Sequence, residues 1–158
     1  MAGHAETISF VARRLIQFEQ RFASAGLDRR RGVSHLFSQI SRSIQNMVLE
    51  LDRDHLPHDA CRDLILYSTR LKESAQEELG GMEADRLSSA LGEACDKEKI
   101  FLEFRSSDRK KYLVEELEKA AILIQALANG IYMVPEEPLP REPGRQEIDV
   151  PSQDAQDR

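Results

Sequence analysis

Apolar residues recur every three or four positions along five stretches of this sequence, and this periodicity restricts the chain to helical folds. Steps of three and four residues place side chains on one face of an α-helix, whereas a half-buried strand needs steps of two. The first stretch contains Ile8, Val11, Leu15, Phe18 and Phe22. The sequence therefore predicts amphipathic helices that bury their apolar faces against one another.

Glycine and proline residues separate these stretches and set the expected limits of the helices. Gly26 and Gly32 follow the first stretch, Pro57 follows the second, and Gly80 and Gly81 close the third. Proline is typical of the first helical turn and glycine of the position just after the last turn. The expected helices cover residues 7–25, 33–51, 57–79, 83–94 and 107–130.

The fourth and fifth predicted helices could form one rod, because no residue between them forces the chain out of a helix. A helix over residues 83–130 would be roughly 72 Å long, while neighbours of about 20 residues reach only about 30 Å. We therefore expect a break at Arg105–Asp108, and a dimer if the break is absent. A short strand at Ile100–Phe104 is the alternative for the segment before it, but no second strand is available for pairing.

The end of the chain differs in composition from the rest. Five of the six prolines lie between Pro135 and Pro151, and residues 135–158 contain seven acidic and three basic residues. So few apolar residues cannot offset the entropy that is lost on folding. The sequence predicts one helical domain over residues 1–134 and a disordered, proline-rich acidic tail over residues 135–158.

The last predicted helix has almost no polar face between Ala120 and Val134. A helix that is apolar all round is buried, so we favour a central position in the bundle. The alternative is an apolar surface that another protein or an identical subunit covers. The residues expected to make this interaction are Leu117, Ala121, Ile124, Leu127, Ala128 and Ile131.

Charge restricts the partners and the location of the chain. The net charge of -6 disfavours nucleic acids and anionic membranes, because both attract basic surfaces.

The N-terminus does not resemble a signal peptide, and no apolar run approaches the roughly 20 residues that span a bilayer, so we expect a cytoplasmic protein. Cys61 and Cys95 have no metal-type spacing and are expected to be reduced, semi-buried thiols.

Potential metal ligands cluster between the second and third predicted helices. Asp54, His55, His58 and Asp59 carry the carboxylate and imidazole groups that bind metals. The two histidines straddle Pro57, and no second ligand pair completes a tetrahedral shell. We therefore predict neither a metal nor another cofactor, and expect the aspartates to end one helix and start the next.

Arg30 and His35 have the R-x4-H spacing of the HEPN ribonucleases, and the chain resembles that family in these two residues. HEPN ribonucleases are helical bundles that act as dimers. The resemblance implies that Arg30 would stabilise a phosphorane and that His35 would transfer protons. An Asn, Asp or His often follows the arginine in that family, whereas Arg31 follows it here. An arginine-rich loop leading into a helix is the commoner origin of such a spacing.

No glycine-rich phosphate loop, nucleophile elbow or thiol motif is present in the sequence. We expect an all-α, antiparallel bundle of four or five helices that acts as a non-enzymatic interaction module, such as an adaptor, a regulatory subunit or an assembly subunit. The heptad spacing favours a homodimer or a stable complex with another protein. The alternatives are a HEPN-like ribonuclease using Arg30 and His35, and a metal-binding protein using the loop 52–61.

Overall fold

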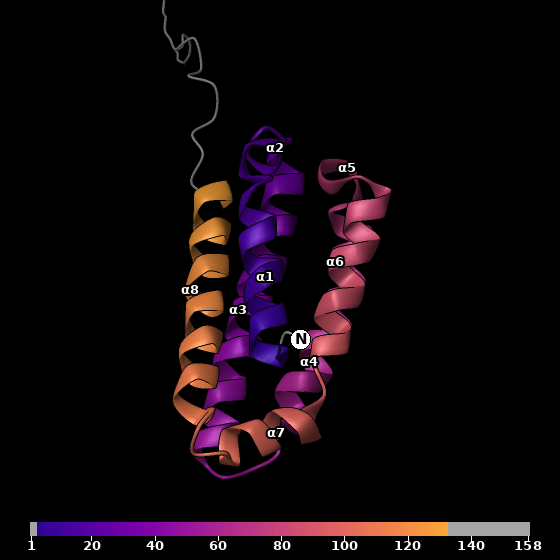
Figure 1. Ribbon diagram of the computed structural model, residues 1–158. Coiled ribbons are helices and arrows are strands. Elements are labelled where there is room, and N and C mark those ends of the chain that lie inside the picture. The colour runs from indigo at the N-terminus through magenta and orange to yellow at the C-terminus, as the bar shows by residue number, and fades with distance from the viewer. Residues whose placement is uncertain (1–2, 133–158) are drawn as a thin grey trace, which may run out of the picture.

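The computed structural model describes residues 3–132, which form a bundle of α-helices without any strand (Figure 1). The predicted all-α class is therefore confirmed. Five longer helices make the body of the bundle: α1 (His4–Ile16), α3 (Leu27–Asp52), α4 (His58–Ser74), α6 (Gly81–Ala94) and α8 (Lys110–Tyr132). Three short helices connect them: α2 (Glu19–Ala23), α5 (Gln76–Leu79) and α7 (Lys97–Arg105). The predicted tail, residues 135–158, lies outside the described residues.

The five longer helices form a closed ring. Helix α8 packs against α3 and α1, α3 packs against α4, α4 packs against α6, and α6 packs against α1. The longer helices that follow one another in the chain are antiparallel (Figure 1). The ring has an odd number of members, so α1 and α8 run in the same direction. Their starts meet where the Tyr112 hydroxyl donates a hydrogen bond to the Glu6 carboxylate at 2.9 Å.

The interior of the ring is apolar, and the helix faces that the periodicity predicted are the ones that line it. Ile8, Phe37, Leu64, Leu91 and Leu117, one from each longer helix, have no solvent exposure. Burial of such side chains contributes about 1.5 to 3 kcal/mol each. In the first predicted stretch, Ile8, Val11, Leu15 and Phe22 are buried as the periodicity predicted, whereas Phe18 is only partly buried.

Small residues allow close contact between α3 and α8. The Ser34 hydroxyl donates to the carbonyl oxygen of Ala128 at 2.8 Å, and the Ser41 hydroxyl donates to that of Ala121 at 2.7 Å. All four residues are buried. A serine side chain is short, so these bonds hold the two helix backbones close together. The small residues of α8 thus accommodate a helix of the same chain.

The structure differs from the sequence prediction at the first helix, which was expected to run unbroken over residues 7–25. The helical conformation is interrupted at Phe18, between α1 and α2. The Phe18 ring lies beside the guanidinium groups of Arg14 and Arg21. Phe22 instead turns into the core and packs edge-to-face on Phe37, with 5.3 Å between the ring centroids. The interruption therefore buries one aromatic ring and leaves the other partly exposed.

The start of α3 also differs, because the helix begins at Leu27 rather than near Val33 and includes Gly32. The first turn is anchored by Arg29, whose guanidinium binds both carboxylate oxygens of Glu78 at 2.5 and 2.7 Å. It also donates to the carbonyl oxygen of Ser74 at 2.6 Å. These contacts with a distant part of the chain offset the low helix propensity of glycine.

The predicted break between the last two helices is confirmed, since residues 106–109 separate α7 from α8. The single-rod alternative is therefore wrong. The strand alternative is also wrong, because Ile100–Phe104 belongs to α7 and buries Ile100 and Phe104. The Asp96 carboxylate caps α7 by accepting a hydrogen bond from the amide of Lys99 at 3.2 Å. The last helix starts at Lys110, three residues after the predicted start at Ser107.

The expectation that α8 is central and buried all round is wrong. Helix α8 is one wall of the ring, and its outer face is exposed at Ile122, where 67% of the residue is accessible to solvent. Short or uncharged residues such as Gln125, Ala126 and Asn129 occupy the rest of this face and gave the segment its apolar composition. An outer face can be weakly polar without being covered.

Two isoleucines on α8 test its orientation. We expect Ile124→Ala to lower the free energy of unfolding by about 2 to 5 kcal/mol, because Ile124 is fully buried and its truncation leaves a cavity. Ile122→Ala, the matched control two positions away, should change it by less than about 0.5 kcal/mol. Denaturant unfolding of both variants measures the difference. Equal losses would contradict the orientation of α8.

Candidate functional site

The six residues of α8 that the sequence proposed for partner binding all face the interior of the bundle. Their exposed fractions are at most 2%. They pack within the same chain, so they offer no surface to a partner in this structure. The residues concerned are Leu117, Ala121, Ile124, Leu127, Ala128 and Ile131.

The structure does not place the Arg30 and His35 side chains on the same side of their helix. Both lie on α3, where five residues correspond to a rotation of about 140° around the helix axis. Arg30 is buried and already has an interaction partner, while His35 is exposed. A phosphate group held by one of them would thus lie away from the other, and the HEPN-like alternative gains no support.

The potential metal ligands of the loop 52–61 are engaged separately. Asp54 accepts hydrogen bonds from Arg105 at 3.0 and 3.2 Å, and His58 Nδ1 lies 2.6 Å from Lys97 Nζ. Asp59 forms an ion pair with Arg62 at 3.4 Å, while His55 is exposed. Within residues 3–132, no three histidine, cysteine or acidic side chains are arranged to hold a metal ion.

An open groove of about 380 Å³ runs between the outer faces of α3 and α8. Val48 and Ala121 are buried and form its floor, whereas Leu49 is 52% and Ile122 is 67% exposed. The other lining residues are Gln45, Asp52 and Glu118. The groove is therefore mainly apolar, and the charges in its lining are negative.

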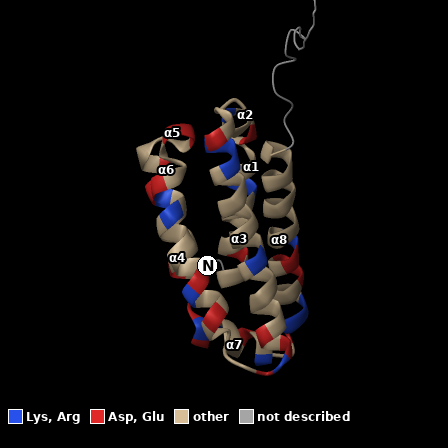
Figure 2. Ribbon diagram, turned by 180° about the vertical axis from the view of Figure 1, so that it is seen from behind, with Lys and Arg blue, Asp and Glu red and all other residues tan. Residues whose placement is uncertain are grey.

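Charged side chains gather elsewhere on the bundle. Figure 2 shows acidic and basic residues at α7 and the lower part of α8, and also on α2, α5 and α6, whereas the end of α8 beyond Lys119 has none. The sequence contains two basic groups, Arg29–Arg31 at the start of α3 and Arg105–Lys111 between α7 and α8. They lie at opposite ends of the bundle, with Arg29 beside Glu78 and Arg105 beside Asp54. They therefore do not form one continuous basic surface.

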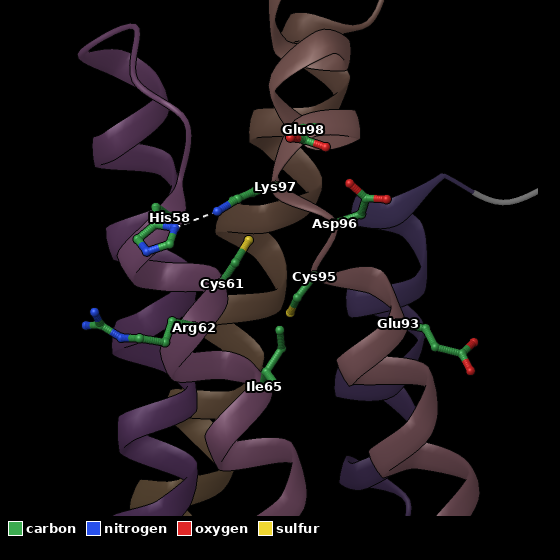
Figure 3. A pocket seen from close by; sticks show the side chains of 9 residues that line it. All are labelled: His58, Cys61, Arg62, Ile65, Glu93, Cys95, Asp96, Lys97 and Glu98. Carbon is green, nitrogen blue, oxygen red and sulfur yellow. Dashed lines mark hydrogen bonds between the residues drawn. The ribbon is translucent and has the colours of Figure 1, made fainter.

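A second pocket, of about 580 Å³, lies where α4, α6 and α7 meet, and it contains both cysteines (Figure 3). Cys61 belongs to the first turns of α4, and Cys95 directly follows Ala94, the last residue of α6. Figure 3 shows the two side chains extending into the same space, with Lys97 on one side and Ile65 on the other. Both thiols are free and almost fully buried.

The two thiols interact, and this makes them chemically different. A hydrogen bond from Cys95, together with the nearby Lys97 ammonium group, lowers the pKa of the Cys61 thiol. The same hydrogen bond, together with burial, raises the pKa of the Cys95 thiol. Cys95 Sγ also lies 3.2 Å from the carbonyl oxygen of Leu91.

Glu50 places a carboxylate at the beginning of α4, beside this pocket. The backbone amides of Ala60 and Asp59 act to lower its pKa. Burial and the negative charge of Asp59 raise it more, so the pKa of Glu50 lies above its usual value. The charge of Glu50 opposes ionisation of Cys61.

The thiol pair was not predicted as a site, since residues 61 and 95 share no local motif and meet only when α4 packs on α6. The groove was not predicted either. Leu49 and Ile122 are ordinary residues of two separate helices, and only the contact between α3 and α8 brings them together.

Comparison of the chain with protein-family models, with curated proteins and with solved structures finds no match. In the part of the chain that the structure describes, no helix combines the length and the apolar character needed to cross a membrane.

The raised pKa of Glu50 predicts the effect of Glu50→Gln. The folded chain holds the Glu50 proton more tightly than the unfolded chain does, so ionisation of Glu50 above this pKa destabilises the fold. Glutamine keeps an acceptor oxygen without the charge. We therefore expect a higher thermal midpoint than wild type at pH 7, and a difference that disappears below about pH 4.5.

Thermal unfolding between pH 4 and pH 7 makes this measurement, with Glu73→Gln, which changes an exposed carboxylate near the end of α4, as the control for loss of one charge. A Glu50→Gln variant that is less stable than wild type at pH 7 would show that the charge supports the start of α4.

Proposed function

We propose that this protein is a non-enzymatic interaction module that binds one helix of another protein in the groove between α3 and α8. The observation that carries the proposal is the joint exposure of Leu49 and Ile122 along one apolar groove. A groove between two antiparallel helices accepts the side-chain ridge of a third helix. An adaptor, a regulatory subunit or an assembly subunit would use such a surface.

The negative charge of the groove favours a basic helix of another protein over a second copy of this chain. Asp52 and Glu118 are the charged residues that line it. A partner helix with an apolar ridge and flanking lysine or arginine residues would pair with both carboxylates. A second copy of this acidic chain would bring like charges together, and the heptad faces that favoured a homodimer are used inside the bundle. We therefore favour a basic helix of another protein over the homodimer.

The proposal includes a cytoplasmic location, which rests on the sequence. Cys61 and Cys95 are free thiols, and a reducing compartment keeps thiols in this state.

A synthetic peptide tests the groove directly. The probe is a fluorescent amphipathic helix of about 18 residues, with leucines at positions i, i+3, i+4 and i+7 and lysines beside them. We expect this peptide to bind the intact protein, and Ile122→Ser to weaken the dissociation constant about tenfold or more, because the groove loses an exposed apolar wall. Fluorescence anisotropy measures both constants.

Two controls accompany this experiment. Met82→Ser removes an apolar side chain that is 91% exposed on α6, away from the groove, and should leave binding unchanged. A peptide with glutamates in place of the lysines should bind more weakly, since Asp52 and Glu118 repel it. Equal binding of the two peptides, or no binding to a monomeric protein, would overturn the proposal.

Analytical sedimentation measures whether a second copy of this chain, rather than a helix of another protein, occupies the groove. A dimer that Ile122→Ser dissociates, without any binding of the lysine peptide, would show that the groove joins two copies of this chain. That outcome would replace the basic helix of another protein as the occupant.

A further inference from the structure

We propose that Cys61 and Cys95 form a dithiol site that hydrogen peroxide oxidises to an intramolecular disulfide. The pocket between α4, α6 and α7 admits the oxidant, and the two side chains extend into it from different helices (Figure 3). This site is separate from the groove between α3 and α8, and it does not depend on the proposed function.

Position favours a bond between these two sulfur atoms. Both thiols line one pocket at the junction of α4 and α6, and their side chains extend into it from different elements (Figure 3). Cys61 is held by the regular helix α4, whereas Cys95 follows the last residue of α6 and has non-helical backbone angles, with φ −88° and ψ 55°. Only Cys95 and Asp96 separate α6 from α7. The Cys95 side can therefore adjust when the sulfur atoms approach to bonding distance.

The pocket also separates the roles of the two thiols. The ammonium group of Lys97 lies near Cys61 and stabilises its thiolate, the form that attacks peroxide. Cys95 is held as the thiol by burial and by its contact with the thiolate. We therefore assign Cys61 as the nucleophile and Cys95 as the resolving thiol. Both cysteines are less than a tenth exposed. A small oxidant such as hydrogen peroxide can therefore reach them, whereas a disulfide of another protein is too large.

The reaction has two steps. The Cys61 thiolate attacks one oxygen of hydrogen peroxide, the O–O bond breaks, and hydroxide leaves, which produces the sulfenic acid of Cys61. The Cys95 sulfur then attacks the Cys61 sulfur, and the S–O bond breaks as the S–S bond forms. The Cys95 proton and the leaving hydroxide combine as water. The two thiols are oxidised together by two electrons, and one peroxide is reduced to two waters.

The disulfide would join the first turns of α4 to the connection between α6 and α7. It closes the chain from residue 61 to residue 95, which includes most of α4 and all of α5 and α6. Closing a loop of this size restricts the unfolded chain. Oxidation should therefore raise the thermal midpoint by about 5 to 10 °C, in a manner that a reducing agent reverses.

Peptide mass mapping after peroxide treatment tests the site on the intact protein. We expect the mass to fall by two hydrogens, and trypsin to release the fragment 54–62, which contains Cys61, linked to the fragment 87–97, which contains Cys95. In Cys95→Ser, dimedone should trap a sulfenic acid on Cys61. In Cys61→Ser, Cys95 should remain unmodified over the same period.

Lysine variants show whether the pocket controls the reaction. Lys97→Gln should slow peroxide consumption about three- to tenfold, because the Cys61 thiolate loses a neighbouring positive charge. Lys99→Gln, which removes the same charge from an exposed position on α7, should leave the rate unchanged. Thermal unfolding of each variant verifies that it is folded.

Three outcomes would overturn the proposal. They are a disulfide between two chains, equal reactivity of Cys61 and Cys95 in the single variants, and a folded wild-type protein whose thiols do not react with peroxide. Each would show that the contact between the thiols is only part of the packing of α4 on α6.

Discussion

The close approach of α3 and α8 is the constraint on which the rest of the bundle depends. Two serines on α3 donate to carbonyl groups of Ala121 and Ala128, so only small residues fit along this contact. With α8 fixed against α3, its larger residues, Leu117 and Ile124, fill the interior of the ring. The same contact determines which residues of the two helices remain outside, and therefore creates the groove that Leu49 and Ile122 border.

The odd number of longer helices explains two features that local sequence does not. One pair in the ring has to be parallel, and no short loop can join parallel neighbours, so α1 and α8 are held by side chains at both ends. At one end Glu6 accepts from Tyr112. At the other, a Glu19 carboxylate oxygen lies 2.7 Å from the position of a Cβ atom at Gly130, and α2 packs over α8. A larger residue at Gly130 would displace this carboxylate, which is the end of a flexible side chain.

Periodicity located the longer helices and their inward faces because burial of apolar surface is the largest favourable contribution to folding. Helix ends were less predictable, since distant contacts stabilise them, as Glu78 does for Arg29 at the start of α3. The surroundings of α8 were mispredicted because composition does not distinguish a buried face from an exposed face of alanine and amide residues. Neither pocket had a local signature. Cys61 meets Cys95, and Leu49 meets Ile122, only through helix packing.

The electrostatic roles at the start of α4 are divided between two residues. A helix N-terminus would ordinarily favour a thiolate such as that of Cys61, but the Glu50 carboxylate interacts with the backbone amides of Ala60 and Asp59 there. Its negative charge then acts against the thiolate, and Lys97 supplies the opposing positive charge. Lys97 also donates to His58, so one side chain connects α7 to α4 and places a charge beside the thiols. A movement of α7 away from α4 would therefore break this connection and also remove the charge that favours the reactive form of Cys61.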